Sequence, residues 1–137
     1  MIINTTESYY YFNWGENFVS QMFTSGDFLV FQLESGFALL RLLAVDESHA
    51  GKIWHLATYS DFFPDVETSE TATANPAGLQ ASNPHIALTN RAFESTQVAR
   101  IANVPLTMVE KELLMNWRAD PTRQVSDRSV RLMLGIR

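Results

Sequence analysis

The sequence predicts a mainly β domain with one clear helix (α+β), built around a small, partly open antiparallel β-barrel. Three observations support this fold class. Runs of β-branched and aromatic residues recur along the chain, turn-forming residues separate them, and one later segment has helical periodicity. The 137 residues, 46% of them hydrophobic, suffice for one domain with a buried core. We therefore expect a single domain over residues 1–137.

The strongest β signal is a hairpin over residues 26–46. Gly26 and Asp27 have the turn chemistry that starts a strand, and a second apolar run begins at Phe37. Gly36 lies between the runs, where a glycine can take the positive φ of a tight turn. The apolar residues are too dense for simple alternation, so both strands are expected to be buried on both faces. This density favours a strongly curved barrel over an open sheet.

A third strand is expected over residues 52–60, which are rich in aromatic and β-branched side chains. His55 lies inside it, where a lone histidine is more often a hydrogen-bonded sheet residue than a catalytic base. Pro64 ends the segment, because proline cannot continue a strand ladder. Residues 66–82 are small and polar, which predicts a long, mobile surface loop.

The last third of the chain alternates between strand and helix signals. Residues 85–90 predict a fourth strand, residues 91–95 a single helical turn, and residues 96–104 a fifth strand with a β-bulge near Ala99-Arg100. Residues 129–136 alternate with period two and predict a terminal strand, although a short helix after Ser126 is the alternative.

The clearest helix spans residues 105–117. Thr107 and Glu110 form a capping box, in which each side chain binds an unsatisfied backbone N–H group of the first turn. Val109, Leu113 and Trp117 recur at helical spacing and predict an apolar face. This face is expected to plug or flank the sheet, and a partner-binding groove is the alternative.

Composition limits the possible functions. The chain has no cysteine, so disulfides and thiolate metal sites are excluded, and no cofactor is expected. No apolar run is long enough to span a membrane, and the first residues lack the features of a signal peptide. We therefore expect a cytoplasmic protein that does not bind membranes.

Charge is distributed unevenly along the sequence. Residues 1–90 carry ten acidic side chains against Arg41 and Lys52, whereas residues 91–137 carry eight basic and five acidic ones. The acidic part would repel a phosphate backbone, so no nucleic acid is expected as partner, and it can attract a basic protein. Tyrosines 9–11 could stack on bases, but no cation precedes Arg41, which favours packing or protein contact.

The candidate partner-binding site lies at the end of the third strand. Residues 46–70 hold six carboxylates and one lysine, together with two adjacent phenylalanines. Carboxylates can orient a basic partner, and a phenylalanine can anchor it, although these phenylalanines could instead close the barrel. The proposed contact residues are Asp61, Phe62, Phe63, Asp65, Glu67 and Glu70.

Three segments, within residues 25–117, resemble the "immunity protein 26" family of bacterial immunity proteins. They are the hairpin from Gly26-Asp27-Phe28 to Leu43, the strand end Tyr59–Phe63, and residues 92–106. The chain departs from the family pattern where a glycine before Arg41 and a tryptophan near Val98 would be expected. The resemblance implies a non-enzymatic, partly barrel-like immunity protein that binds and blocks a cognate toxin.

Two other functions compete with this interpretation. A Gly-Asp pair that opens a hydrophobic hairpin also begins many SH3-like barrels, and such barrels resemble ribonuclease toxins of the PemK and MazF type. That chemistry needs cationic groups, and Arg41, Arg91 and Arg100 with His55 are the available set. No hydrolase elbow, phosphate loop or metalloprotease motif is present. The other alternative is a structural or assembly protein that forms homodimers or larger homo-oligomers.

Overall fold

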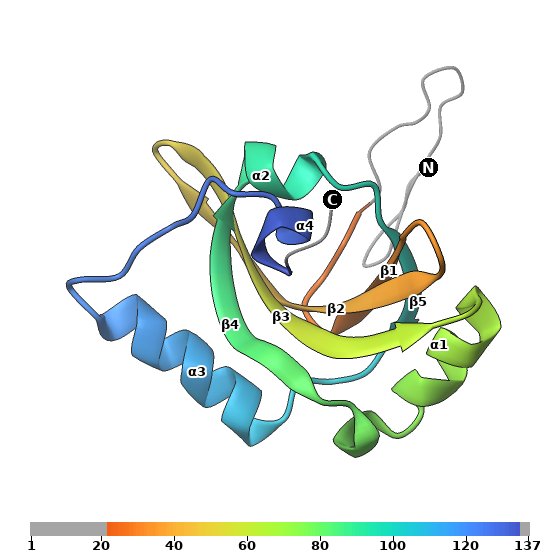
Figure 1. The fold of residues 1–137 in the computed structure, drawn as a ribbon. Coiled ribbons are helices and arrows are strands. Elements are labelled where there is room, and N and C mark those ends of the chain that lie inside the picture. Colours follow the sequence, from red (N-terminus) through yellow and green to blue (C-terminus); the bar gives the residue numbers. More distant parts are fainter. Residues whose placement is uncertain (1–21, 135–137) are drawn as a thin grey trace, which may run out of the picture.

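The computed structural model describes residues 22–134, so the predicted aromatic contacts of residues 9–18 lie outside the described residues. The fold is mainly β, as predicted, with one antiparallel sheet in the order β4-β3-β2-β1-β5 (Figure 1). The strands are β1 (Asp27–Gln32), β2 (Phe37–Ser48), β3 (Gly51–Phe63), β4 (Ala81–Thr89) and β5 (Ala99–Asn103). The helices are α1 (Val66–Thr73), the 3₁₀ helix η1 (Pro76–Gly78), α2 (Asn90–Glu94), α3 (Met108–Ala119) and α4 (Val130–Met133).

The sheet is open, because no pairing joins its edge strands β4 and β5 among the described residues. It is nevertheless strongly curved (Figure 1). The SH3-like, partly open barrel thus stays a prediction.

The β1–β2 hairpin forms as predicted, with Phe28 opposite Arg41 and Gln32 opposite Phe37. A positive φ in the turn was the expected reason for Gly36, but the structure gives a different one. Gly36 does not have a positive φ; among the described glycines only Gly26 and Gly51 do. A Cβ on Gly36 would instead lie 2.5 Å from the carbonyl oxygen of Phe63. Close approach of the end of β3 therefore requires the glycine.

Alternating side chains of the central strands build a core on each face of the sheet. Along β1, Leu29 and Phe31 point into one core, while Phe28 and Val30 point into the other. Figure 1 shows α2 and α4 on the concave side, and their residues Phe93 and Val130 belong to the first core. The prediction that both strands are buried on both faces is confirmed.

Helix α3 lies on the opposite side of the sheet, next to β4, and contacts β2 and β4 (Figure 1). Its capping box between Thr107 and Glu110 is present as predicted. The predicted apolar face is only partly correct, because Val109 is exposed and Leu114 is the buried residue. The helix therefore flanks the sheet on a face that contains Glu110, Leu114 and Trp117.

The prediction of an irregular loop over residues 66–82 is wrong, because α1 and η1 form there and β4 already begins at Ala81. Helix α1 starts because the carboxylate of Asp65 accepts a hydrogen bond of 2.7 Å from the backbone N–H of Thr68. Ser69 and Thr73 are buried, and each hydroxyl donates to a backbone carbonyl three residues earlier. Small polar residues can thus form a packed helix. The mobility of the segment stays a prediction.

The predicted terminal strand over residues 129–136 is also wrong. The Ser129 side chain caps α4 by accepting from the backbone N–H of Leu132, and Val130 is fully buried. The single-turn helix, the alternative considered above, is the correct interpretation for the described part of this range.

The remaining elements agree with the predictions in type. Strand β4 starts earlier than expected, and Pro84 is tolerated in it because β4 is an edge strand. Along β5, Ala102 and Arg100 pair with consecutive residues of β1, so Ile101 is the bulge residue, one position from the predicted Ala99-Arg100. Within residues 22–134, no helix has the length and apolar character needed to cross a membrane.

Candidate functional site

The six predicted contact residues lie together at the end of β3 and the start of α1. We call Asp61, Phe62, Phe63, Asp65, Glu67 and Glu70 the acidic–aromatic surface. The structure divides them into two groups, one that holds the local fold and one that is free to contact a partner.

The two phenylalanines point to different environments. Phe63 is half-buried and packs against the core that contains Phe28 and Tyr59. Phe62, opposite Ala38 in the sheet, is 55% exposed. The sequence allowed the phenylalanines either to anchor a partner or to close the core. In the structure, Phe63 closes the core, and Phe62 is available as an anchor.

The carboxylates also divide. Asp61 accepts a hydrogen bond from the backbone N–H of Gln80 at 2.8 Å, which ties the end of β3 to the chain before β4. Asp65 caps α1, and hydrogen bonds from the Thr68 side chain and backbone lower its pKa. Glu67 and Glu70 are exposed and have no such role.

None of these four carboxylates forms an ion pair with another residue of the described chain. By contrast, the ion-paired carboxylates of the described residues are Asp27, Asp46, Glu110 and Asp127, on other parts of the fold. The acidic–aromatic surface therefore keeps its negative charge uncompensated. An open hollow of about 750 Å³ adjoins it at Val66. Its lining is mixed: apolar side chains such as Phe37 and Val98 lie beside polar and charged ones that include Glu94 and Arg131.

A second polar site, which the sequence did not reveal, lies between the sheet and α3. We call Asp46, His55, His85, Trp117 and Arg118 the histidine cluster. His55 is fully buried; its Nε2 lies 3.0 Å from Asp46 Oδ2 and its Nδ1 lies 2.9 Å from His85 Nε2. The Trp117 ring packs edge-on against both imidazoles, at centroid distances of 4.8 and 6.0 Å.

Electrostatics in the histidine cluster keep both imidazoles neutral at pH 7. Arg118 donates two hydrogen bonds to Asp46, of 3.1 and 2.6 Å, and thereby lowers the pKa of this carboxyl. Burial lowers the pKa of His55 more than Asp46 raises it. Burial lowers the pKa of His85 to about 4, with smaller contributions from the charge of His55, once that ring is protonated, and from the charge of Arg118.

The hydrogen bonds also fix the tautomers. The Asp46 carboxylate can only accept, so His55 Nε2 carries the proton and neutral His55 Nδ1 accepts from His85 Nε2–H. The remaining lone pair lies on His85 Nδ1. No group of three or more His, Asp or Glu side chains in residues 22–134 has the arrangement of a metal site.

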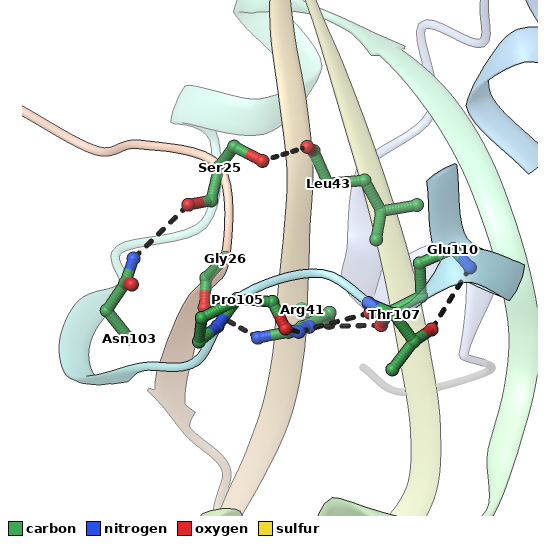
Figure 2. A network of polar contacts seen from close by, with 8 residues as sticks. All are labelled: Ser25, Gly26, Arg41, Leu43, Asn103, Pro105, Thr107 and Glu110. Atoms are coloured by element: carbon green, nitrogen blue, oxygen red, sulfur yellow. Dashed lines mark hydrogen bonds and ion pairs between the residues drawn. The ribbon is translucent and has the colours of Figure 1, made fainter. Parts of the chain in front are cut away.

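The N-terminal end of α3 is fixed by a buried arginine (Figure 2). Arg41, 2% exposed, donates two hydrogen bonds to the Glu110 carboxylate and one each to the carbonyls of Gly26 and Pro105. Its guanidinium also lies 4.5 Å from the ring centroid of Phe28. Burial raises the pKa of Glu110, but the bonds from Arg41 and Thr107 outweigh it, so the net pKa is lowered. Arg41 is a structural residue.

The cations and histidine considered for ribonuclease chemistry do not form a common site. Arg41 is held by Glu110, Arg91 pairs with Asp127, and Arg100 pairs with the buried Asp27. The two exposed members lie on separate elements, Arg91 on α2 and Arg100 on β5, each in its own ion pair, and His55 is buried within the histidine cluster.

One signal in the sequence could have revealed part of the histidine cluster. The tight β2–β3 turn pairs Ser48 with Gly51, and this register places Asp46 diagonally opposite His55. The positions of His85 and Arg118 could not have been found in this way. They depend on bulges between the strands and on the packing of α3.

Comparison of this chain with protein-family models, curated proteins and solved structures found no match.

Proposed function

We propose that this protein is a non-enzymatic protein-binding module whose acidic–aromatic surface receives a basic partner. The observation that supports the proposal is the exposed Phe62 beside carboxylates that form no ion pair within the described chain. Large aromatic side chains supply much of the binding energy in protein interfaces, and uncompensated charge speeds encounter with a partner of opposite charge.

Within the acidic–aromatic surface, exposed residues and residues that hold the local fold would have different roles. Phe62, Glu67 and Glu70 would contact the partner, while Asp61, Phe63 and Asp65 would hold the strand end and helix in place. The hollow beside Val66 offers space for a side chain of the partner. A cytoplasmic immunity-type inhibitor that binds and blocks a toxin, carried on an SH3-like partly open barrel, is the specific form of this proposal.

The test uses a variant that leaves the supporting residues intact. Phe62→Ala, Glu67→Lys and Glu70→Lys combined should abolish capture of the partner from the source cell. The matched control is Met108→Ala with Glu112→Lys, which changes an exposed apolar residue and an exposed carboxylate on α3. Retention of every partner by the first variant, with an unchanged circular dichroism spectrum, would contradict the proposal.

Two further measurements separate the competing functions. Purified protein is expected to leave RNA intact; cleavage that is lost in an Arg91→Ala or Arg100→Ala variant would replace the binding proposal by the ribonuclease one. Capture of only a second copy of this chain, with a matching change of mass in sedimentation, would favour the homo-oligomeric assembly protein.

A further inference from the structure

The two ends of α3 are attached to the sheet by chemically different contacts. Near its start, the guanidinium of Arg41 binds Glu110, and an arginine keeps its charge at every pH relevant to a folded protein. Near its end, Trp117 and Arg118 rest on Asp46, His55 and His85. Only the second attachment contains groups that change charge between neutral and mildly acidic pH.

The hydrogen bond between the histidines can tolerate one proton but not two. The first added proton goes to His85 Nδ1, which holds the free lone pair, and the single proton between His85 Nε2 and His55 Nδ1 keeps the hydrogen bond. A second proton would go to the one nitrogen of this contact that still has a lone pair. Two N–H groups would then face each other across 2.9 Å, between two cations whose rings are 5.1 Å apart. The contact between the rings would have to break.

The neighbouring charges do not relieve this repulsion. Among residues 22–134, Asp46 on β2 is the one acidic group in contact with the imidazoles, and it is already bound to Arg118 of α3. Arg123, after α3, lies over the outer face of Trp117 and adds positive charge. Below pH 7 the cluster therefore becomes increasingly cationic, and His85, which is half-buried on β4, is the ring with a route to solvent.

We infer that the histidine cluster is an acid-sensitive latch, which holds the C-terminal half of α3 on the sheet and releases it when both imidazoles are protonated. The N-terminal half stays attached through Arg41 and Glu110, so the release is local. The lowered pKa of each histidine agrees with the geometry, because the folded state resists the charge that opens it.

Cysteine labelling measures this release directly, because the natural chain has no cysteine. Leu114→Cys places a thiol on the buried side of α3, Met115→Cys places one on its exposed side, and Ala38→Cys places one in the core of the sheet. The reagent is 4,4′-dithiodipyridine, which reacts with thiols in acid. The Met115→Cys rate corrects for the pH dependence of the thiol chemistry itself.

Between about pH 7.5 and about pH 4, the labelling rate at position 114 relative to that at 115 is expected to rise about tenfold or more. Position 38 should stay protected over the same range. His85→Gln should strongly reduce the rise, because His55 is then the one imidazole left in the cluster, whereas His49→Gln, at an exposed histidine, should leave the rise unchanged.

A flat wild-type ratio, equal opening at position 38, or the same acid-induced rise in His85→Gln would each overturn the inference. Because Leu114→Cys could itself destabilise the packing of α3, a second measurement uses NMR on protein without an introduced cysteine. The Trp117 ring packs against both imidazoles in the folded state, so the NMR signal of its indole N–H should shift over the same pH range when these contacts are lost. This shift should occur in the wild type and His49→Gln, and be strongly reduced in His85→Gln.

Discussion

Replacement of Arg41 by methionine should be among the most damaging single substitutions in the protein. The change removes all four hydrogen bonds of the guanidinium and leaves the Glu110 carboxylate, 19% exposed, without its cation. Loss of one partner of a buried ion pair costs about 3–5 kcal/mol. Because Glu110 can still be partly hydrated, we expect a loss near the lower end, about 3 kcal/mol, in the free energy of unfolding.

Urea unfolding of a double-mutant cycle with Glu110→Gln measures how much of this loss belongs to the pair. Glu110 is also half of the capping box, since Oε1 accepts from the Thr107 N–H at 2.9 Å. Thr107→Ala, expected to cost about 1 kcal/mol, is therefore the control for the helix cap. The double variant should be less damaged than the sum of the single ones by about 2 kcal/mol. Additive losses, or a loss below about 1 kcal/mol for Arg41→Met, would refute the assignment of Arg41 as the attachment of α3.

Three further predictions follow from the same structure. Trp117→Ala should lower the unfolding free energy by about 2–3 kcal/mol, less than for a fully buried aromatic residue, and an unchanged urea midpoint would mean that the ring does not support the fold. The free energy of unfolding should fall as the pH drops from about 6.5 to about 4, because His85 takes up a proton more readily in the unfolded chain than in the folded one. A pKa shift of this size is worth up to about 3 kcal/mol, and solvent at the half-buried ring reduces this to about 2 kcal/mol. The same dependence of stability on pH in the wild type and in His85→Gln would contradict this prediction. Limited proteolysis should cut first within residues 66–82 and leave fragments held together by the β3–β4 pairing, whereas first cuts elsewhere would show that this segment is not the most mobile.

Local sequence signals predicted the elements that local chemistry determines. The capping box needs only Thr107 and Glu110, and the β1–β2 hairpin needs only two apolar runs and a short turn. Residues 129–136 show the limit of such signals. Their period-two pattern favoured a strand, but the Ser129 cap and the burial of Val130 against the concave core favour a helical turn.

The same limit applies to the candidate sites. Burial of Arg41 could not be predicted, because its partners come from two segments distant from it in sequence, at Gly26 and at Pro105 to Glu110. The acidic–aromatic surface was found because its residues are close in sequence. Even so, the sequence left open whether Phe62 and Phe63 anchor a partner or close the barrel. The packing of the core determines that Phe63 is the inner one.

The most direct test of the proposed function is hydrogen–deuterium exchange of the captured complex compared with the free protein. A partner that docks on the acidic–aromatic surface should slow exchange at the end of β3 and along α1, from Phe62 to Thr73. Exchange in the outer turns of α3 should stay unchanged. Slower exchange on α3 without any change between residues 62 and 73 would contradict the proposal, because the partner would then bind through a different face of the molecule.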